Sequence, residues 1–205
     1  YLIVFNNLIN NLYICTPNYV WKTHLMSSKL LLNSTEIHII LHRLACQLIE
    51  NHNDFSETVL IGLQPRGVYL ADRLSQILKD DYNIQGINSG HLDITFYRDD
   101  FRRRDAPLEA NKTSLNCDIE NKNIVFIDDV LYSGRSISAA LSAIQSFGRP
   151  NIIELLVLID RRFSRHLPIQ PNYIGRQIDV INNERVIVHW KEKDGKDAIH
   201  LIPND

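Results

Sequence analysis

The stretch IVFIDDVLYSGRS, Ile124 to Ser136, decides the fold class. Its apolar start predicts a buried strand, and two acids, Asp128 and Asp129, follow at the carboxyl end of that strand. The segment SGRS is typical of a tight turn into a helix, because Gly134 lets the backbone approach closely. This order of strand, acidic pair, small-residue loop and helix predicts a crevice lined by carboxylates and free backbone N–H groups.

Each part of that crevice has a chemical use. Two carboxylates at a strand end can accept hydrogen bonds from the 2′ and 3′ hydroxyls of a ribose. The free N–H groups at the helix start form an anion site with the helix dipole, and the hydroxyls of Ser133 and Ser136 add donors. The combination predicts a ribose 5-phosphate site. It is not a Walker A loop, because the pattern GxxxxGK[ST] is absent.

The segments on both sides alternate between strand and helix patterns. Asn33 and Glu36 predict a capping box before a first helix, whose apolar face comprises Ile37, Ile40, Leu41, Leu44 and Leu48. Further helices are predicted around 71–78 and 137–144, and strands at 58–63, 92–96, 123–128, 152–159 and 184–190. This alternation predicts an α/β fold with a mainly parallel central sheet flanked by helices. Ligands then bind beyond the carboxyl ends of the strands.

Composition and residue spacing argue against several other classes of function. The 205 residues carry a net charge of -2, so the whole chain offers no general attraction to polyanions. The sequence contains no run of 18 apolar residues, so no membrane span is predicted. Cys15, Cys46 and Cys117 form no CxxC pair, which favours a reducing, cytoplasmic compartment. His38 and His42 have a spacing that can hold zinc, but they are interpreted as surface histidines because no third ligand is apparent.

The central stretch resembles the signature of type I phosphoribosyltransferases, which bind phosphoribosyl pyrophosphate (PRPP). Five other segments are similar to the PyrR family of bifunctional pyrimidine-operon regulators and uracil phosphoribosyltransferases. They are GLQPRGVYLADRL (62–74), HLDITFYRDD (91–100), GRPNIIELLVLIDRR (148–162), LPIQPNYIG (167–175) and ERVIV (184–188). The resemblance spans about Thr35 to Val188 and implies a type I fold with a small hood and a flexible catalytic loop.

The resemblance implies roles for individual residues. Asp128, Asp129 and Arg66 would be catalytic. PRPP would be bound by Ile124, Asp128, Asp129, Val130, Leu131, Tyr132, Ser133, Gly134, Arg135 and Ser136. Pyrophosphate and the flexible loop would involve Pro65, Arg66, Gly67, Arg98, Asp99 and Asp100. Mg²⁺ would be bound through PRPP, without direct protein ligands. One departure is that Gln64 and Pro65 stand where the family commonly has a basic residue and a threonine, which removes one cation near pyrophosphate.

The resemblance favours uracil as the base and UMP as the product. Purine enzymes of this class usually carry an acid at the position of Tyr132 and a lysine at the position of Asp160. Asp160, Arg161 and Tyr173 are the predicted base-binding residues, with Tyr173 stacking on the ring. A phosphoribosyltransferase for another base is the alternative.

A second hypothesis is a UMP-dependent regulator that binds pyrimidine-operon leader mRNA, with or without catalysis. Arg43, Arg165 and Arg176 match basic positions of the family's RNA-facing surface, whereas Cys46 and Gln170 replace a usual histidine and arginine. We also expect a homo-oligomer.

Met26 is the only methionine, so residues 1–25 are predicted to be an upstream, disordered extension before a phosphoribosyltransferase domain at 26–205.

Overall fold

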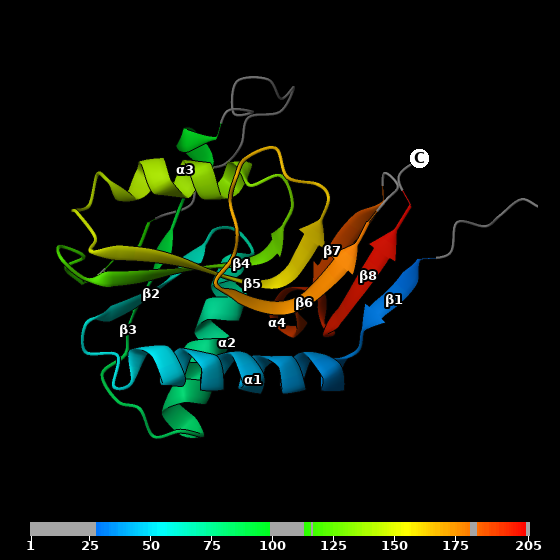
Figure 1. The fold of residues 1–205 in the computed structure, drawn as a ribbon. Coiled ribbons are helices and arrows are strands. Elements are labelled where there is room, and N and C mark those ends of the chain that lie inside the picture. The colour runs from blue at the N-terminus through cyan, green and yellow to red at the C-terminus, as the bar shows by residue number, and fades with distance from the viewer. Residues whose placement is uncertain (1–27, 99–112, 116, 181–183, 204–205) are drawn as a thin grey trace, which may run out of the picture.

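The computed structural model describes residues 28–98, 113–115, 117–180 and 184–203 (Figure 1). The expectation of a disordered extension at 1–25 therefore lies outside the described residues. So do Asp99, Asp100 and most of the predicted catalytic loop.

A five-stranded parallel sheet forms the centre of the molecule, with strand order β3-β2-β4-β5-β6. The strands are β2 (Thr58–Leu63), β3 (Asn88–Leu92), β4 (Asn123–Leu131), β5 (Ile152–Arg162) and β6 (Tyr173–Asp179). The middle of β2, β4 and β5 is continuously apolar because both faces of the sheet are covered. Register pairs Gly62 with Ile127 and Leu131 with Asp160, so the carboxyl ends meet at one edge.

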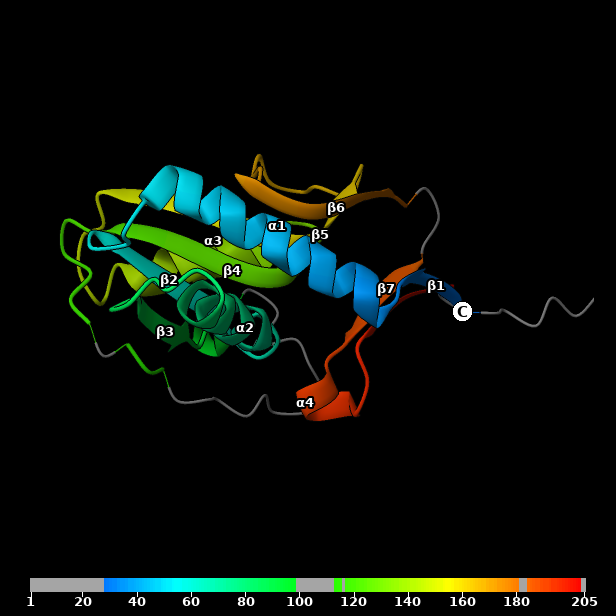
Figure 2. The same cartoon turned by 90° about the horizontal axis from the view of Figure 1, so that it is seen from below.

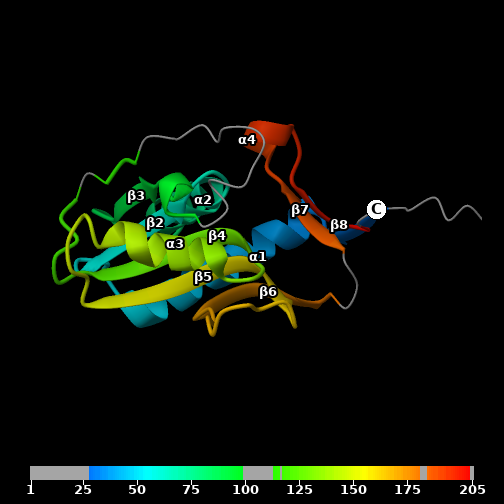
Figure 3. The same ribbon diagram turned by 90° about the horizontal axis from the view of Figure 1, so that it is seen from above.

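Helices cover both faces of the sheet, as predicted. α1 (Ser34–His52) and α2 (Gly67–Asp80) lie on one face, and α3 (Arg135–Ile144) lies on the other (Figures 1–3). The capping box is confirmed: Asn33 Oδ1 accepts from the Glu36 N–H, and a Glu36 carboxylate oxygen accepts from the Asn33 N–H. The predicted apolar face of α1 is buried at Ile37, Leu41, Leu44 and Leu48, with Ile40 partly covered.

A small antiparallel sheet forms the hood at the end toward which the parallel strands point (Figure 1). Its strands are β1 (Lys29–Leu32), β7 (Arg185–His189) and β8 (Ala198–Ile202), with the short α4 (Lys191–Asp194) between the last two. Fully buried Trp190 joins the core under α1 and α2. The Arg73 guanidinium of α2 stacks 4.8 Å over its ring and binds Glu192 and Asp197, so the hood is fastened to α2.

One predicted strand is wrong beyond its first residue. The alternation of Leu92, Ile94 and Phe96 predicted a strand through 96, but β3 ends at Leu92 and Thr95–Tyr97 form the 3₁₀ turn η1. The cause is Asp93, whose carboxylate accepts hydrogen bonds from the N–H and the hydroxyl of Thr95. Such side-chain bonds compete with a strand and favour a turn.

Candidate functional site

The acidic pair lies at the carboxyl end of β4, as predicted. Asp129 is 8% exposed, and Asp128 is half-buried, with its Oδ1 accepting from the Asp129 N–H at 2.9 Å. Removal from water, followed by the charge of Asp129, raises the pKa of Asp128, and the Arg98 guanidinium opposes this. Burial raises the pKa of Asp129 to about 6, against the opposing charge of Arg66. At this edge the desolvation of the two carboxyl groups therefore outweighs the opposing charges of the two arginines.

A hollow of about 300 Å³ lies between this edge and the start of α3. Gly134 caps α3 in the left-handed conformation with φ 88°, and a Cβ there would lie 3.2 Å from the Ile169 side chain. The turn leaves the first N–H groups of a ten-residue helix facing the hollow, which is the arrangement that binds anions. The hollow collects most of the predicted PRPP-binding residues. Its lining comprises Arg98, Asp128, Val130, Leu131, Tyr132, Ser133, Gly134, Arg135, Ser136 and Ile137.

On the other side of the acidic pair, the predicted pyrophosphate loop joins β2 to α2. Pro65 is exposed, and Gly67 begins α2 against the backbone of β4. The Arg66 guanidinium donates to the carbonyl of Val188 in β7, and its charge acts on Asp129. The two arginines come from different segments, since Arg66 directly precedes α2 and Arg98 directly follows η1.

The residues predicted to bind the base separate into two environments. The Arg161 guanidinium lies 4.2 Å from the ring centre of Tyr132, a residue that is 45% exposed beside the hollow. Among the described groups, the Nε of Arg161 is buried without a hydrogen-bond partner, and burial lowers the Arg161 pKa. Asp160, in β5, instead accepts hydrogen bonds from Arg165 of the loop that follows β5 and from Gln177 of β6. The Arg161 side chain is therefore buried against Tyr132, whereas the Asp160 carboxylate is bound by Arg165 and Gln177.

Two predicted site residues are wrong. Ile124 is fully buried near the start of β4, within the apolar core on the α3 side, so it cannot contact PRPP. Tyr173 is 3% exposed at the amino end of β6, where its hydroxyl binds Asn51, His52 and Glu154. Desolvation raises the Tyr173 pKa to about 12, helped by the hydrogen bond and charge of Glu154 and opposed by the hydrogen bond from Asn51. Tyr173 is a core residue and cannot stack on a base at the opposite edge.

The sequence did not indicate that Arg165 supports the phosphate loop through hydrogen bonds. The Arg165 guanidinium donates to the carbonyls of Leu131, Tyr132 and Arg161 at 2.6 to 3.2 Å, and its Nε donates to Ile169. The N–H groups of His166 and Leu167 both donate to the Ser133 carbonyl. Arg165 is therefore part of the site's framework, and its predicted contact with RNA stays a prediction. Its only sequence signal was a charge in the loop after β5.

The other two predicted RNA arginines are exposed at the β6 edge. Arg43 of α1 donates to the carbonyls of Ile174 and Gly175, and Arg176 donates to the carbonyl of Leu31. Their guanidinium groups therefore hold α1 and β1 against β6, and they also leave positive charge on that edge.

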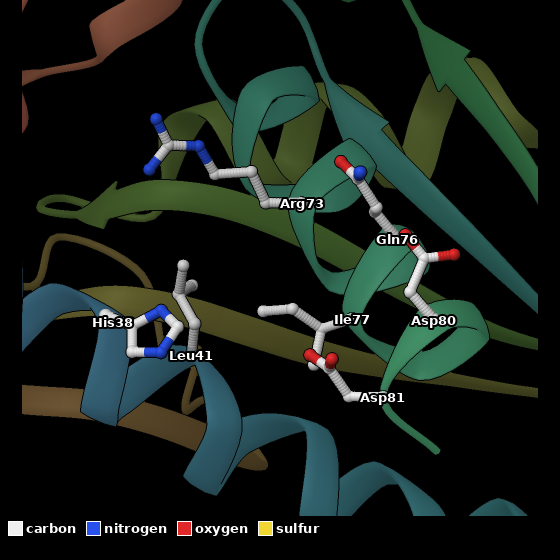
Figure 4. Close-up of a pocket in the computed structure, with 7 residues that line it drawn as sticks. All are labelled: His38, Leu41, Arg73, Gln76, Ile77, Asp80 and Asp81. Carbon is white, nitrogen blue, oxygen red and sulfur yellow. The ribbon is translucent and has the colours of Figure 1, made fainter. Parts of the chain in front are cut away.

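A second hollow, of about 320 Å³, lies between α1 and α2 (Figure 4). Leu41 and Ile77 point toward each other across it, and its polar lining comprises His38, Arg73, Gln76, Asp80 and Asp81. None of the predicted site residues lines it.

Within the described ranges no cluster of three metal-ligating side chains occurs. None of the described helices combines the length and apolar character that crossing a bilayer requires.

Comparison with known proteins gives a consistent family assignment. The model of the phosphoribosyl transferase domain matches residues 27–193. The bifunctional protein PyrR of Trichormus variabilis is 41% identical over 174 residues, which cover 84% of this chain and 94% of that protein. The PyrR of Enterococcus faecalis is 38% identical over 176 residues, covering 86% and 97%.

Solved structures agree on the fold. The hypoxanthine phosphoribosyltransferase of Trypanosoma cruzi matches with a TM-score of 0.66 at 16% identity, covering 88% of this chain and 99% of that chain. The Staphylococcus aureus hypoxanthine phosphoribosyltransferase matches with a TM-score of 0.62 at 21% identity, covering 83% and 90%. At these identities the likeness supports the type I fold and says nothing about the base.

Proposed function

Because this chain belongs to the phosphoribosyl transferase domain family and, within it, to the bifunctional PyrR proteins, we propose that it converts uracil and PRPP to UMP and diphosphate. The observation that carries the proposal is the acidic pair of β4, with Asp129 buried and Asp128 half-buried, beside an anion-binding helix start. The carboxylates can bind ribose hydroxyls, and the N–H groups at the start of α3 can bind a 5′-phosphate of the same molecule.

The residues divide the work by position. Asp128 and Asp129 accept hydrogen bonds from the ribose hydroxyls, and their negative charge stabilises positive charge that develops at C1. The N–H groups around Ser133 to Ser136 hold the 5′-phosphate, and Arg66 holds the departing diphosphate. The C1–O bond breaks with its electron pair on diphosphate. Uracil N1 bonds to C1 from the opposite face, and its proton passes to water. The protein accelerates this step by positioning and by electrostatics.

Mg²⁺ is the cofactor that this reaction implies. The donor set fits, since Mg²⁺ prefers oxygen ligands and burial raises the pKa of both carboxyl groups even though the charges of Arg98 and Arg66 act on them. We propose that the ion is bound through PRPP, with Asp128 and Asp129 facing it. When bound, it would neutralise charge on the diphosphate.

Uracil is the proposed base because Tyr132 and Asp160 replace the acid and the lysine of purine enzymes. Purified protein with PRPP and Mg²⁺ is expected to give a kcat/KM for uracil about 10²-fold or more above that for hypoxanthine or guanine. A site that hydrogen-bonds one base edge leaves its polar groups unpaired with another. The measurement is product formation with each base supplied separately. A purine kcat/KM equal to that of uracil would contradict the choice of base but leave PRPP chemistry intact.

The second candidate function is UMP-dependent binding of pyrimidine leader mRNA. It is favoured by the exposed Arg43 and Arg176 at the β6 edge, because a chain of net charge -2 needs a local cluster to attract RNA. Binding to a leader transcript should strengthen with UMP. The double variant Arg43→Gln/Arg176→Gln should weaken it, and each lost phosphate contact should lower the salt slope by about 0.7–0.9.

Filter binding at several salt concentrations measures this, with the exposed Arg149→Gln as the matched control. Arg165→Gln is kept out of that variant because it would disturb the phosphate loop. If wild type binds the leader no better than a random transcript, the chain is an enzyme alone. Homo-oligomerisation also remains a prediction, which light scattering can test.

A further inference from the structure

The segment LDITFYRDD, residues 92–100, is the most specific of the motifs, yet the acidic pair and the phosphate loop do not explain it. Its first half forms a fixed turn. The Asp93 carboxylate accepts from the Thr95 N–H at 2.9 Å and from the Thr95 hydroxyl at 2.6 Å. This arrangement ends β3 and starts η1, so Asp93 sets the direction in which the chain leaves the sheet.

The turn is held on two further sides. The N–H of Asp93 donates to the Thr113 hydroxyl at 3.1 Å, and His91 pairs with Ser114 through two backbone hydrogen bonds of 2.9 Å. The Tyr97 hydroxyl lies 3.1 Å from the Ser146 hydroxyl beyond the end of α3. These contacts hold η1 beside α3, so the residue directly after η1 lies close to that helix.

Arg98 occupies that position. Its side chain is half-buried and lines the hollow between β4 and α3, with Nη1 3.5 Å from the hydroxyl of Ser136. Its charge reaches Asp128 and opposes the rise in the pKa of that acid. Arg66, by contrast, acts on Asp129 from the pyrophosphate loop. Arg98 thus lines the hollow at the start of α3, whereas Arg66 directly precedes α2 and is not among the residues that line this hollow.

We propose that Arg98 is a substrate-binding residue that contacts the 5′-phosphate of PRPP and of the nucleotide product, and that Asp93 is its positioning residue. This rests on the proposed PRPP chemistry. It replaces the expectation, drawn from family resemblance, that Arg98 serves pyrophosphate. The phosphate loop supplies backbone N–H groups and the neutral hydroxyls of Ser133 and Ser136. These donors are neutral. Arg98 would add a charge-assisted hydrogen bond to the phosphate, and such a bond is stronger than one from a neutral donor.

Two product fragments separate this role from a role at the diphosphate. Ribose 5-phosphate and magnesium pyrophosphate are each titrated as inhibitors against PRPP. Arg98→Gln should raise the inhibition constant of ribose 5-phosphate about 10- to 100-fold, as expected for a lost charge-assisted bond. It should change that of magnesium pyrophosphate less than about threefold. Arg98→Lys should restore part of the ribose 5-phosphate affinity, because it keeps the charge but not the two-pronged geometry.

Arg66→Gln is the matched control, since it removes the other cation, and it should show the opposite selectivity. Asp93→Ala tests positioning. It should weaken ribose 5-phosphate selectively, and the double variant with Arg98→Gln should be no weaker than Arg98→Gln alone. If Asp93→Ala does not fold, the Arg98 variants still decide the matter. Equal weakening of both fragments, weakening of pyrophosphate alone, or no effect overturns the proposal. Wild type that neither binds nor turns over PRPP would instead reject the proposed function.

Discussion

Asp129→Asn is expected to remove nearly all PRPP turnover while making the unliganded protein more stable at pH 7. Burial raises the pKa of Asp129 from 3.8 to about 6. An acid with a raised pKa contributes stability at low pH, and this contribution is lost as the pH rises through about 6. At neutral pH the buried carboxylate therefore opposes folding, by up to about 3 kcal/mol for such a change in pKa. Asparagine has a similar shape and no charge.

The expected gain in unfolding free energy is about 1–3 kcal/mol at pH 7 and close to zero at pH 4, where the wild-type carboxyl group is mostly protonated. The expected loss in kcat/KM for PRPP is about 10²-fold or more, because the charge acts on the transition state. Asp128→Asn should lose activity in the same way. Urea unfolding at both pH values and initial rates measure these effects. Asp80→Asn, on the exposed end of α2, is the matched control. An Asp129→Asn protein with wild-type kcat/KM would show that this acid does not serve PRPP.

Gly67→Ala should damage both the fold and the site. A Cβ on Gly67 would lie 2.2 Å from the carbonyl oxygen of Ile127 and 3.0 Å from the Cα of Asp128. Both neighbours are backbone atoms of β4, so α2 and the pyrophosphate loop must move away from the acidic pair. We expect a loss of about 3 kcal/mol in unfolding free energy and, because Arg66 moves as well, more than a tenfold loss in kcat/KM for PRPP.

Gly86→Ala provides the matched control. Gly86 has φ 74° and open space around its Cβ position, so alanine meets backbone strain there without a clash. It should cost about 1 kcal/mol and leave kcat/KM unchanged. Circular dichroism during urea unfolding and initial rates compare the two variants. Equal stability losses, with no change in activity for Gly67→Ala, would contradict the close packing of this loop on β4.

The parts of the fold that local sequence determines were predictable. The apolar runs of β2, β4 and β5 and the capping box at Asn33 depend on near neighbours, and the structure confirms them. The hood was harder, because β1 pairs with β8 from the other end of the chain. Four residues of β1 carry too little periodicity to indicate such a partner.

The errors at the site have the same origin. Tyr173 follows a family motif, but its hydroxyl is bound by Asn51 and His52, more than 120 residues away in the chain. The sequence predicted Arg165 to be a surface residue. Its hydrogen bonds to four carbonyl groups form only in the folded loop and could not be predicted. The acidic pair and the glycine turn were predictable because strand, acids and helix start are contiguous in the sequence.

The central claim is that the edge beyond β4 is a PRPP site, and direct binding tests it most plainly. PRPP with Mg²⁺ is titrated calorimetrically into wild type and into Asp128→Asn/Asp129→Asn, with UMP as a competitor. The account predicts saturable binding of one PRPP per chain to wild type, displacement by UMP, and a loss of affinity in the double variant. Wild type without saturable PRPP binding, or a double variant that binds PRPP as tightly as wild type, would contradict it.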